Sequence, residues 1–218
     1  MSGDLVIFSL LTVSSLFIIV NPLAATIAFL SLTPSVSHAT RVQIAGDASR
    51  YALAILLVFA IGGGYILSLF GISLQAFRIA GGILLFGIGM EMVYARPSRT
   101  KLTVTEKYES KEGEDIAVMP LATPMITGPG AITTAIVLMN EAVPMGFTAM
   151  AIVIGVSIAA IAATYVMMCN ADLIVNRVGE RQSRAINRLM GMLLIAIAVQ
   201  FVINAIKEAF PVLVGTGV

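Results

Sequence analysis

Charged residues are scarce in this sequence. Only 11% of the 218 residues are Asp, Glu, Lys or Arg, whereas 58% are hydrophobic, and the mean hydropathy is +0.98. A soluble domain usually carries about 25% charged residues, so this composition argues against a large soluble domain. The bilayer is therefore the expected solvent for most of the chain. The formal net charge of +1 gives no reason to expect a nucleic-acid partner.

Cysteine and histidine are nearly missing. The single Cys169 can form no internal disulfide and suggests no thiolate metal site. His38 is the only histidine, and no pair of buried aspartates is expected, so the residues of an intramembrane protease are lacking. A P-loop is absent as well, so the chain is not expected to hydrolyse ATP. We therefore expect no enzyme, no cofactor and no metal site.

Six apolar runs dominate the chain. A spanning helix needs roughly 20 mostly apolar residues, and the N-terminus has no basic residue before Arg41, so the first run is predicted to be a retained helix rather than a signal peptide. The fold class predicted is an all-α membrane protein with six transmembrane helices. The predicted spans are residues 5–33, 48–70, 74–94, 118–140, 145–169 and 185–209.

Polar connections separate these spans, and their basic residues predict an orientation. The connections near 34–50, 96–117 and 170–188 hold all but Arg78 and Lys207 of the 13 basic residues. Because cytoplasmic loops carry the excess of Lys and Arg, these three connections are predicted to be cytoplasmic loops, with both termini outside. The stretch 96–117 mixes both charges and is predicted to be a solvated loop.

Two pairs of segments indicate an internal repeat. Residues 19–28 and 126–135 share Ile, Pro, Ala, Thr and Ala at equivalent positions, and residues 78–84 match 188–194 at a nearly equal separation. Three helices is an odd number, so the two halves are predicted to have inverted topology, as in many secondary transporters. The predicted units are repeat one (1–95), the charged cytoplasmic loop (96–117) and repeat two (118–218).

Proline interrupts the first and fourth spans near their middles. Asn21-Pro22 and Gly128-Pro129 each place an acceptable N-cap before a proline at the first helical position. Both spans are therefore predicted to be broken near the membrane midplane, with a new helix beginning at each proline. The N–H groups of such a half-helix carry about half a unit of positive charge and can hold a carboxylate.

The residues around the two breaks form the predicted substrate site. Carbonyl groups before each break can receive an ammonium group or a cation. The threonine hydroxyls can contact solute or, with even odds, bond back to their own helical turn. Ala24, Gly130 and Ala131 are expected to leave room for a small solute, whereas Gly81, Gly82 and Gly191 are expected to mark close helix packing. The predicted substrate-binding residues are Asn21, Pro22, Leu23, Ala24, Thr26, Thr123, Pro124, Thr127, Gly128, Pro129, Gly130, Ala131 and Thr133.

These broken segments carry a resemblance to a known family. With Asn21-Pro22-Leu23, Pro120-Leu121, Pro124 and the Gly128-to-Ile132 segment, the chain resembles the MarC/SnatA family over essentially its whole length. The resemblance implies an inner-membrane protein of bacteria or archaea. Some family members are described as transporters of small neutral amino acids such as glycine and alanine. The label of multiple antibiotic resistance, attached to other members, is a poor guide to function.

The leading prediction is a secondary transporter of small neutral amino acids that works by alternating access. Its partners would be a small zwitterionic amino acid and membrane lipid, and the sequence leaves homo-oligomerisation open. No charged residue is expected near the middle of a span, so the choice between H⁺ and Na⁺ as coupling ion also stays open. Two alternatives remain: an exporter or channel for another small solute, and a non-transporting membrane scaffold or regulator that uses the charged loop for docking.

Overall fold

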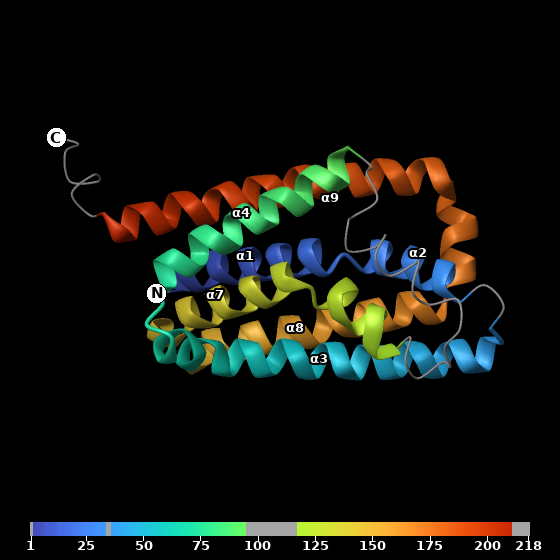
Figure 1. The fold of residues 1–218 in the computed structure, drawn as a ribbon, viewed down its shortest axis with the longest axis horizontal. Coiled ribbons are helices and arrows are strands. Elements are labelled where there is room, and N and C mark those ends of the chain that lie inside the picture. The colour runs from blue at the N-terminus through green and yellow to red at the C-terminus, as the bar shows by residue number, and fades with distance from the viewer. Residues whose placement is uncertain (1, 34–35, 95–116, 211–218) are drawn as a thin grey trace.

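The structure is a computed structural model that describes residues 2–33, 36–94 and 117–210 (Figure 1). Regular secondary structure in these ranges is entirely helical, and no strand occurs there. The helices are α1 (Ser2–Val20), α2 (Pro22–Leu32), α3 (His38–Leu69), α4 (Leu74–Val93), the π-helix η1 (Ala117–Ile126), α7 (Pro129–Met145), α8 (Phe147–Cys169) and α9 (Ala171–Ala209).

Five helical stretches are long and apolar enough to cross a membrane. They are Gly3–Leu30 (which contains α1 and most of α2), α3, α4, α8 and Arg184–Ala209 within α9. The prediction of several membrane-spanning helices is confirmed. The predicted fourth span, 118–140, is not among the five because it divides between η1 with 10 residues and α7 with 17. Each is shorter than the roughly 20 residues that a single span needs.

Two of the predicted loops are helical. α3 begins at His38, where the Ser37 side chain accepts a hydrogen bond from the Thr40 N–H and so caps the helix. α9 includes the whole of 171–188. The prediction of non-helical connections over 38–47 and 171–184 is therefore wrong. Charged residues mark where a helix leaves apolar surroundings, but many of them have good helix propensity and do not end it. The predicted loop at 96–117 lies outside the described residues except for Ala117.

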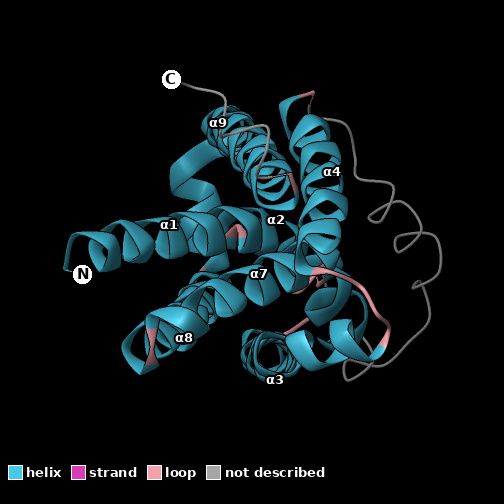
Figure 2. Ribbon diagram, turned by 90° about the vertical axis from the view of Figure 1, so that its left-hand side faces the viewer, coloured by secondary structure: helices cyan, strands magenta, loops and turns pink. Residues whose placement is uncertain are grey.

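The helices bury two separate apolar clusters. The larger is formed almost entirely by α1, α2, α3, η1, α7 and α8, which we call the main body. The smaller consists of Ile18, Leu85, Leu194 and Ala198, and it joins α4 and α9 to each other and to the end of α1. Figures 1 and 2 show α4 and α9 side by side along one side of the main body. We call these two helices the α4/α9 pair.

Glycines allow the α4/α9 pair to pack backbone against backbone. A Cβ atom at Gly82 would lie 2.8 Å from the Ala198 carbonyl oxygen. One at Gly89 would lie 2.9 Å from the Gly191 carbonyl oxygen, and the reverse distance is also 2.9 Å. Small residues of this kind allow close approach of membrane helices. The prediction that Gly82 and Gly191 mark close helix packing is confirmed, while Gly81 faces Thr133 of α7 instead.

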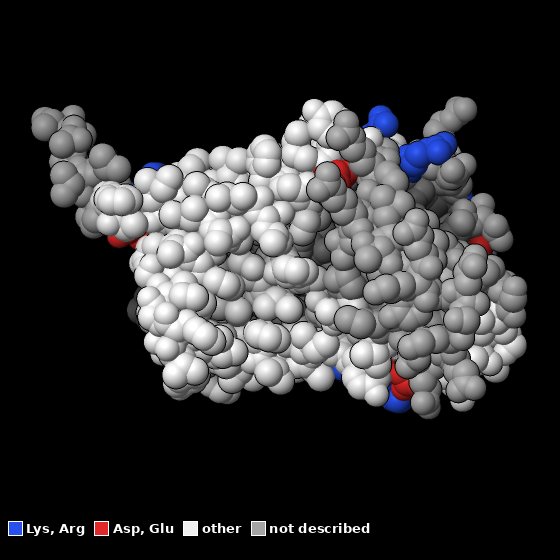
Figure 3. All heavy atoms as spheres, viewed as in Figure 1, with Lys and Arg blue, Asp and Glu red and all other residues white. Residues whose placement is uncertain are grey.

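Charged side chains are unevenly distributed over the surface. On the face seen in Figure 3, basic side chains gather chiefly toward the right-hand end, while uncharged side chains cover most of the left half. Exposed large apolar residues such as Leu10, Tyr65 and Ile83 belong to several helices. An apolar exterior of this kind is what lipid-facing helices require.

Adding one methyl group at Gly191 should destabilise the protein. Gly191→Ala places a Cβ atom 2.7 Å from Met92 Cβ and 2.9 Å from a backbone oxygen, so we expect a loss of about 1–3 kcal/mol. Gly87→Ala on α4 is the matched control, because no atom lies within 4 Å of its Cβ position. Helix propensity should make that change neutral or stabilising by up to about 1 kcal/mol. Thermal unfolding in detergent measures both, and equal melting temperatures would contradict the close α4–α9 packing.

Candidate functional site

A single residue separates α1 from α2. Asn21 has φ 47° and ψ 72°, the only left-handed conformation of a non-glycine residue in the described chain. Asparagine tolerates this region better than most residues. Pro22 follows and has no N–H group, so the Ile18 carbonyl loses the donor that a continuous helix would supply.

The Asn21 side chain makes two hydrogen bonds. Its Oδ1 accepts from the Ala24 N–H at 3.2 Å, which caps α2, and its Nδ2 donates to Asn187 Oδ1 on α9 at 3.2 Å. Because a backbone N–H can only donate, the cap fixes which way the Asn21 amide faces. The Asn187 amide must then turn its oxygen toward Asn21, which directs its own NH₂ group elsewhere. Asn187 lies near the start of the predicted sixth span, and no signal in the neighbouring sequence identifies it as a site residue.

The second break lies between η1 and α7. Thr127 donates twice to the Ala122 carbonyl oxygen, from its N–H at 2.9 Å and from its Oγ1 at 2.8 Å. Gly128 is extended, Pro129 begins α7, and the Ile132 N–H donates to the Gly128 carbonyl at 3.1 Å. The wide turns of η1 are notable because π-helical segments are rare and often occur at functional sites.

α2 and α7 run from the two breaks toward opposite ends of the molecule. Figure 1 shows both breaks in the middle part of the long axis. α2 ends near Asp172, which lies at the start of α9. α7 ends near Glu141, which pairs with Arg78. Glu208, at the end of α9, pairs with the same arginine, so α7 and α9 end on the same side of the molecule. The N-termini of α2 and α7 therefore both point toward the centre.

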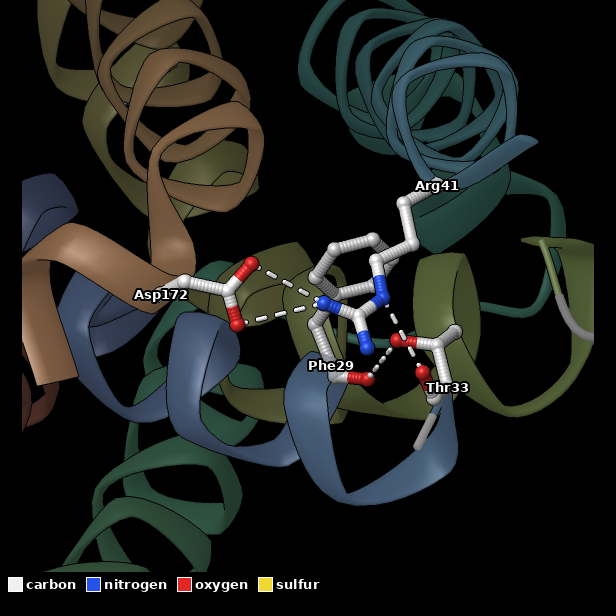
Figure 4. A network of polar contacts seen from close by, with 4 residues as sticks. All are labelled: Phe29, Thr33, Arg41 and Asp172. Carbon is white, nitrogen blue, oxygen red and sulfur yellow. Dashed lines mark hydrogen bonds and ion pairs between the residues drawn. The ribbon is translucent and has the colours of Figure 1, made fainter. Parts of the chain in front are cut away.

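A polar network fixes the far end of α2 (Figure 4). Arg41 Nε donates to the Thr33 carbonyl oxygen at 3.0 Å, and Arg41 Nη1 lies 3.0 Å from Asp172 Oδ2. Thr33 Oγ1 in turn donates to the Phe29 carbonyl at 2.8 Å. The Arg41 side chain is mostly buried, so it joins the end of α2, the first turn of α3 and the start of α9 at one point.

Apolar side chains cover the start of α7. A Cβ atom at Gly130 would lie 2.9 Å from both Ile19 Cδ1 and Leu85 Cδ2, and 3.2 Å from Ile88 Cδ1. The break on α1 and the beginning of α7 are therefore in direct contact. The room that Gly130 was expected to leave for a solute is filled by these three side chains in this conformation. Ala131 is also buried, and Ala24 is half-buried.

The threonines of the predicted site bond mainly to their own helices. Thr26 Oγ1 donates to the Pro22 carbonyl at 2.7 Å, and Thr133 Oγ1 donates to the Pro129 carbonyl at 2.9 Å. The same bond thus recurs in both half-helices. It uses the hydroxyl proton but leaves lone pairs able to accept. Thr123 Oγ1 is buried without a hydrogen-bond partner among the described residues.

The structure thus brings many of the predicted residues together and adds others. Asn21 to Ala24 lie at the start of α2, and Thr127 to Ala131 lie at the start of α7. The half-buried Leu23 is one of this set, and the side chain of Pro124 lies outside the described residues. Asn187 joins this region from α9. A charged cluster of Arg78, Glu141 and Glu208, which the sequence did not predict, lies at one end of the molecule.

These features define an integral, multi-pass helical membrane protein. Residues 6–210 match the family described as MarC family integral membrane protein, and the chain belongs to that family. It is 42% identical to the UPF0056 membrane protein MJ1677 of Methanocaldococcus jannaschii, over 93% of this chain and 97% of that one. The UPF0056 membrane proteins YvbG of Bacillus subtilis (38%; 91% and 94%) and YhcE of Escherichia coli (34%; 90% and 90%) are also similar. No solved structure matches the chain.

The left-handed conformation of Asn21 predicts different losses of stability for two substitutions at this position. Asn21→Ala loses the cap and forces a Cβ-bearing residue with no compensating hydrogen bond into that region, so we expect a loss of about 1–2 kcal/mol. Asn21→Gly loses the same hydrogen bonds but adopts positive φ freely, so it should be the milder change. Thermal unfolding in detergent compares the two. If the glycine variant were less stable than the alanine variant, the claim that the backbone is strained at Asn21 would be contradicted.

Proposed function

We propose that this protein is a secondary transporter of small neutral amino acids, of the glycine and alanine type, in the cell membrane. It works by alternating access, with the substrate held between the half-helices α2 and α7. The observation that carries the proposal is the convergence of two helix N-termini on the centre of the molecule from opposite ends. A zwitterion supplies the carboxylate that such N-termini hold.

The proposal includes six spans in two inverted repeats. In this arrangement η1 and α7 cross the membrane together as one broken span, just as α1 and α2 do. Two observations support the equivalence. The threonine-to-proline bonds at Thr26 and Thr133 are the same in both halves, and the third helices of the halves, α4 and α9, pack on each other through glycines. The breaks then lie near mid-membrane, and both termini lie outside.

The proposed site has a separate partner for each end of the substrate. The carboxylate meets the N–H groups at the starts of α2 and α7. The ammonium group meets the Ile18 carbonyl, which Pro22 leaves without a donor, and the unpartnered Thr123 Oγ1. Ile19, Leu85 and Ile88 crowd Gly130, which favours a substrate with little or no side chain.

Uptake of labelled glycine or alanine by vesicles that contain the purified protein tests the proposal. H⁺ and Na⁺ gradients are imposed separately, because either ion could couple transport. We expect accumulation with one gradient and none in protein-free vesicles. If neither amino acid moves or binds under any gradient, the substrate assignment fails. Gradient-independent movement of a different small solute would instead identify an exporter or channel.

Removing one hydroxyl at the proposed site should impair transport selectively. Thr133→Val keeps the shape of the side chain but deletes the oxygen that could accept from substrate, so we expect at least a tenfold fall in uptake rate. Thr164→Val is the matched control. Thr164 on α8 is also buried and makes the same kind of bond, to the Ala160 carbonyl at 2.8 Å. Equal effects on uptake in the two variants would remove Thr133 from the site.

A deletion separates transport from a scaffolding role. Residues 101–114 lie outside the described structure and belong to the charged segment that a scaffold would use for docking. A transporter with its site at the helix breaks should keep uptake when 101–114 are deleted and should lose it in Asn21→Ala. The assay is the same vesicle uptake, together with the cellular phenotype of a deletion strain. Loss of function only in the loop deletion would favour the scaffold.

A further inference from the structure

Arg78 is a buried cation held by two carboxylates. Its side chain is only 3% exposed, and it lies near the start of α4. Arg78 Nη2 lies 2.7 Å from Glu141 Oε1 on α7, and Nη1 lies 2.6 Å from Glu208 Oε1 on α9. Removing one partner of a buried charge is strongly destabilising. The two ion pairs therefore stabilise the conformation in which both can form.

The Arg78–Glu141 pair closes a line of contacts between α4 and α7. The line begins at the second helix break, where Gly130 lies against Leu85 and Ile88. It continues where Thr133 lies against Gly81, and it ends at Glu141 and Arg78. Residue numbers rise along α7 while they fall along α4, so the two helices are antiparallel here. This α4–α7 seam therefore runs from the second break to one end of the molecule.

The other ion pair of Arg78 stays within the α4/α9 pair. These two helices meet in a buried cluster that also includes Ile18 of α1, and they touch backbone to backbone at Gly89 and Gly191. If they moved together, Arg78 would keep Glu208 as its counter-ion. The Arg78 Nε atom is buried without a hydrogen-bond partner among the described residues.

The opposite end of α9 is tied to the main body. Ala171, its first residue, belongs to the larger buried cluster, and Asp172 pairs with Arg41 of α3. Figure 1 shows that α9 turns a corner after this segment before it runs along α4. The α4/α9 pair is thus held fast at one end and attached through Arg78–Glu141 at the other.

We propose that the α4/α9 pair moves as one unit against the main body, that it pivots near Arg41–Asp172, and that Arg78–Glu141 is the lock that keeps the α4–α7 seam closed. Opening the seam exposes the helix breaks from the end of the molecule where α1 begins and α9 ends. This inference rests on the proposed transport function for its purpose. The lock itself can be tested without any substrate.

Labelling of a cysteine placed in the seam tests the lock. In the background Cys169→Ala/Thr133→Cys, the added thiol replaces a side chain that is 7% exposed. A membrane-impermeant maleimide is applied to vesicles from the side that carries the start of α1. Glu141→Gln should raise the labelling rate about tenfold or more, because it breaks the tie to α7. Glu208→Gln, the matched control, leaves that tie in place and should change the rate much less.

Three outcomes of this labelling overturn the proposal: no change in Glu141→Gln, equal increases in both variants, or a larger increase in Glu208→Gln. If Glu141→Gln does not accumulate as folded protein, Glu141→Asp serves instead, because it keeps the charge and shortens the reach; it should give a smaller rise. If labelling behaves as expected but the protein with its native Thr133 moves no amino acid, the lock is supported and the proposed substrate is refuted. Amino-acid transport without any difference in labelling rate between the variants would support the proposed substrate and refute the lock.

Discussion

The need to satisfy main-chain polar groups in apolar surroundings governs this structure. An N–H or C=O group exposed to hydrocarbon costs several kcal/mol, so a membrane helix can be interrupted only where other protein groups cover the gap. At the first break, the Asn21 side chain supplies the missing acceptor for Ala24, and Asn187 holds it from α9. At the second, Thr127 turns both its donors onto the Ala122 carbonyl. The α4/α9 pair packs against the starts of α2 and α7. Together with these hydrogen bonds, this packing explains how the chain can leave helical geometry at two places inside the bundle.

The sequence predicted those parts of the structure that depend on neighbours along the chain. Asn21-Pro22 and Gly128-Pro129 carry their own capping and helix-starting chemistry, so the starts of α2 and α7 follow from two residues each. Gly82 and Gly191 were predicted to mark close packing because small residues in apolar helices usually serve that purpose. The starts of α3 and α9 were not predictable in the same way. Polarity reports what surrounds a helix rather than where the helix begins, so 38–47 and 171–184 were predicted to be loops although both are helical.

The contacts that sequence reasoning missed are all between distant segments. Asn187 lies in a polar stretch, and nothing near it in the chain indicates a partner at Asn21. Arg78, Glu141 and Glu208 each lie near the end of an apolar run, where a charged residue normally reaches water. Their convergence depends on how α4, α7 and α9 cross. Gly130 shows the converse: its small size was taken as room for a ligand, and the space is filled by side chains from α1 and α4.

The great length of two helices gives the molecule unlike ends. At 1.5 Å per residue, the 32 residues of α3 extend roughly 48 Å, against about 30 Å for the hydrocarbon layer. α9 has 39 residues but turns a corner before it runs along α4, so its first part adds breadth to that end of the molecule (Figure 1). The polar beginnings of both helices lie together there, where Arg41 meets Asp172. This end therefore carries more helix than one crossing of the hydrocarbon layer requires.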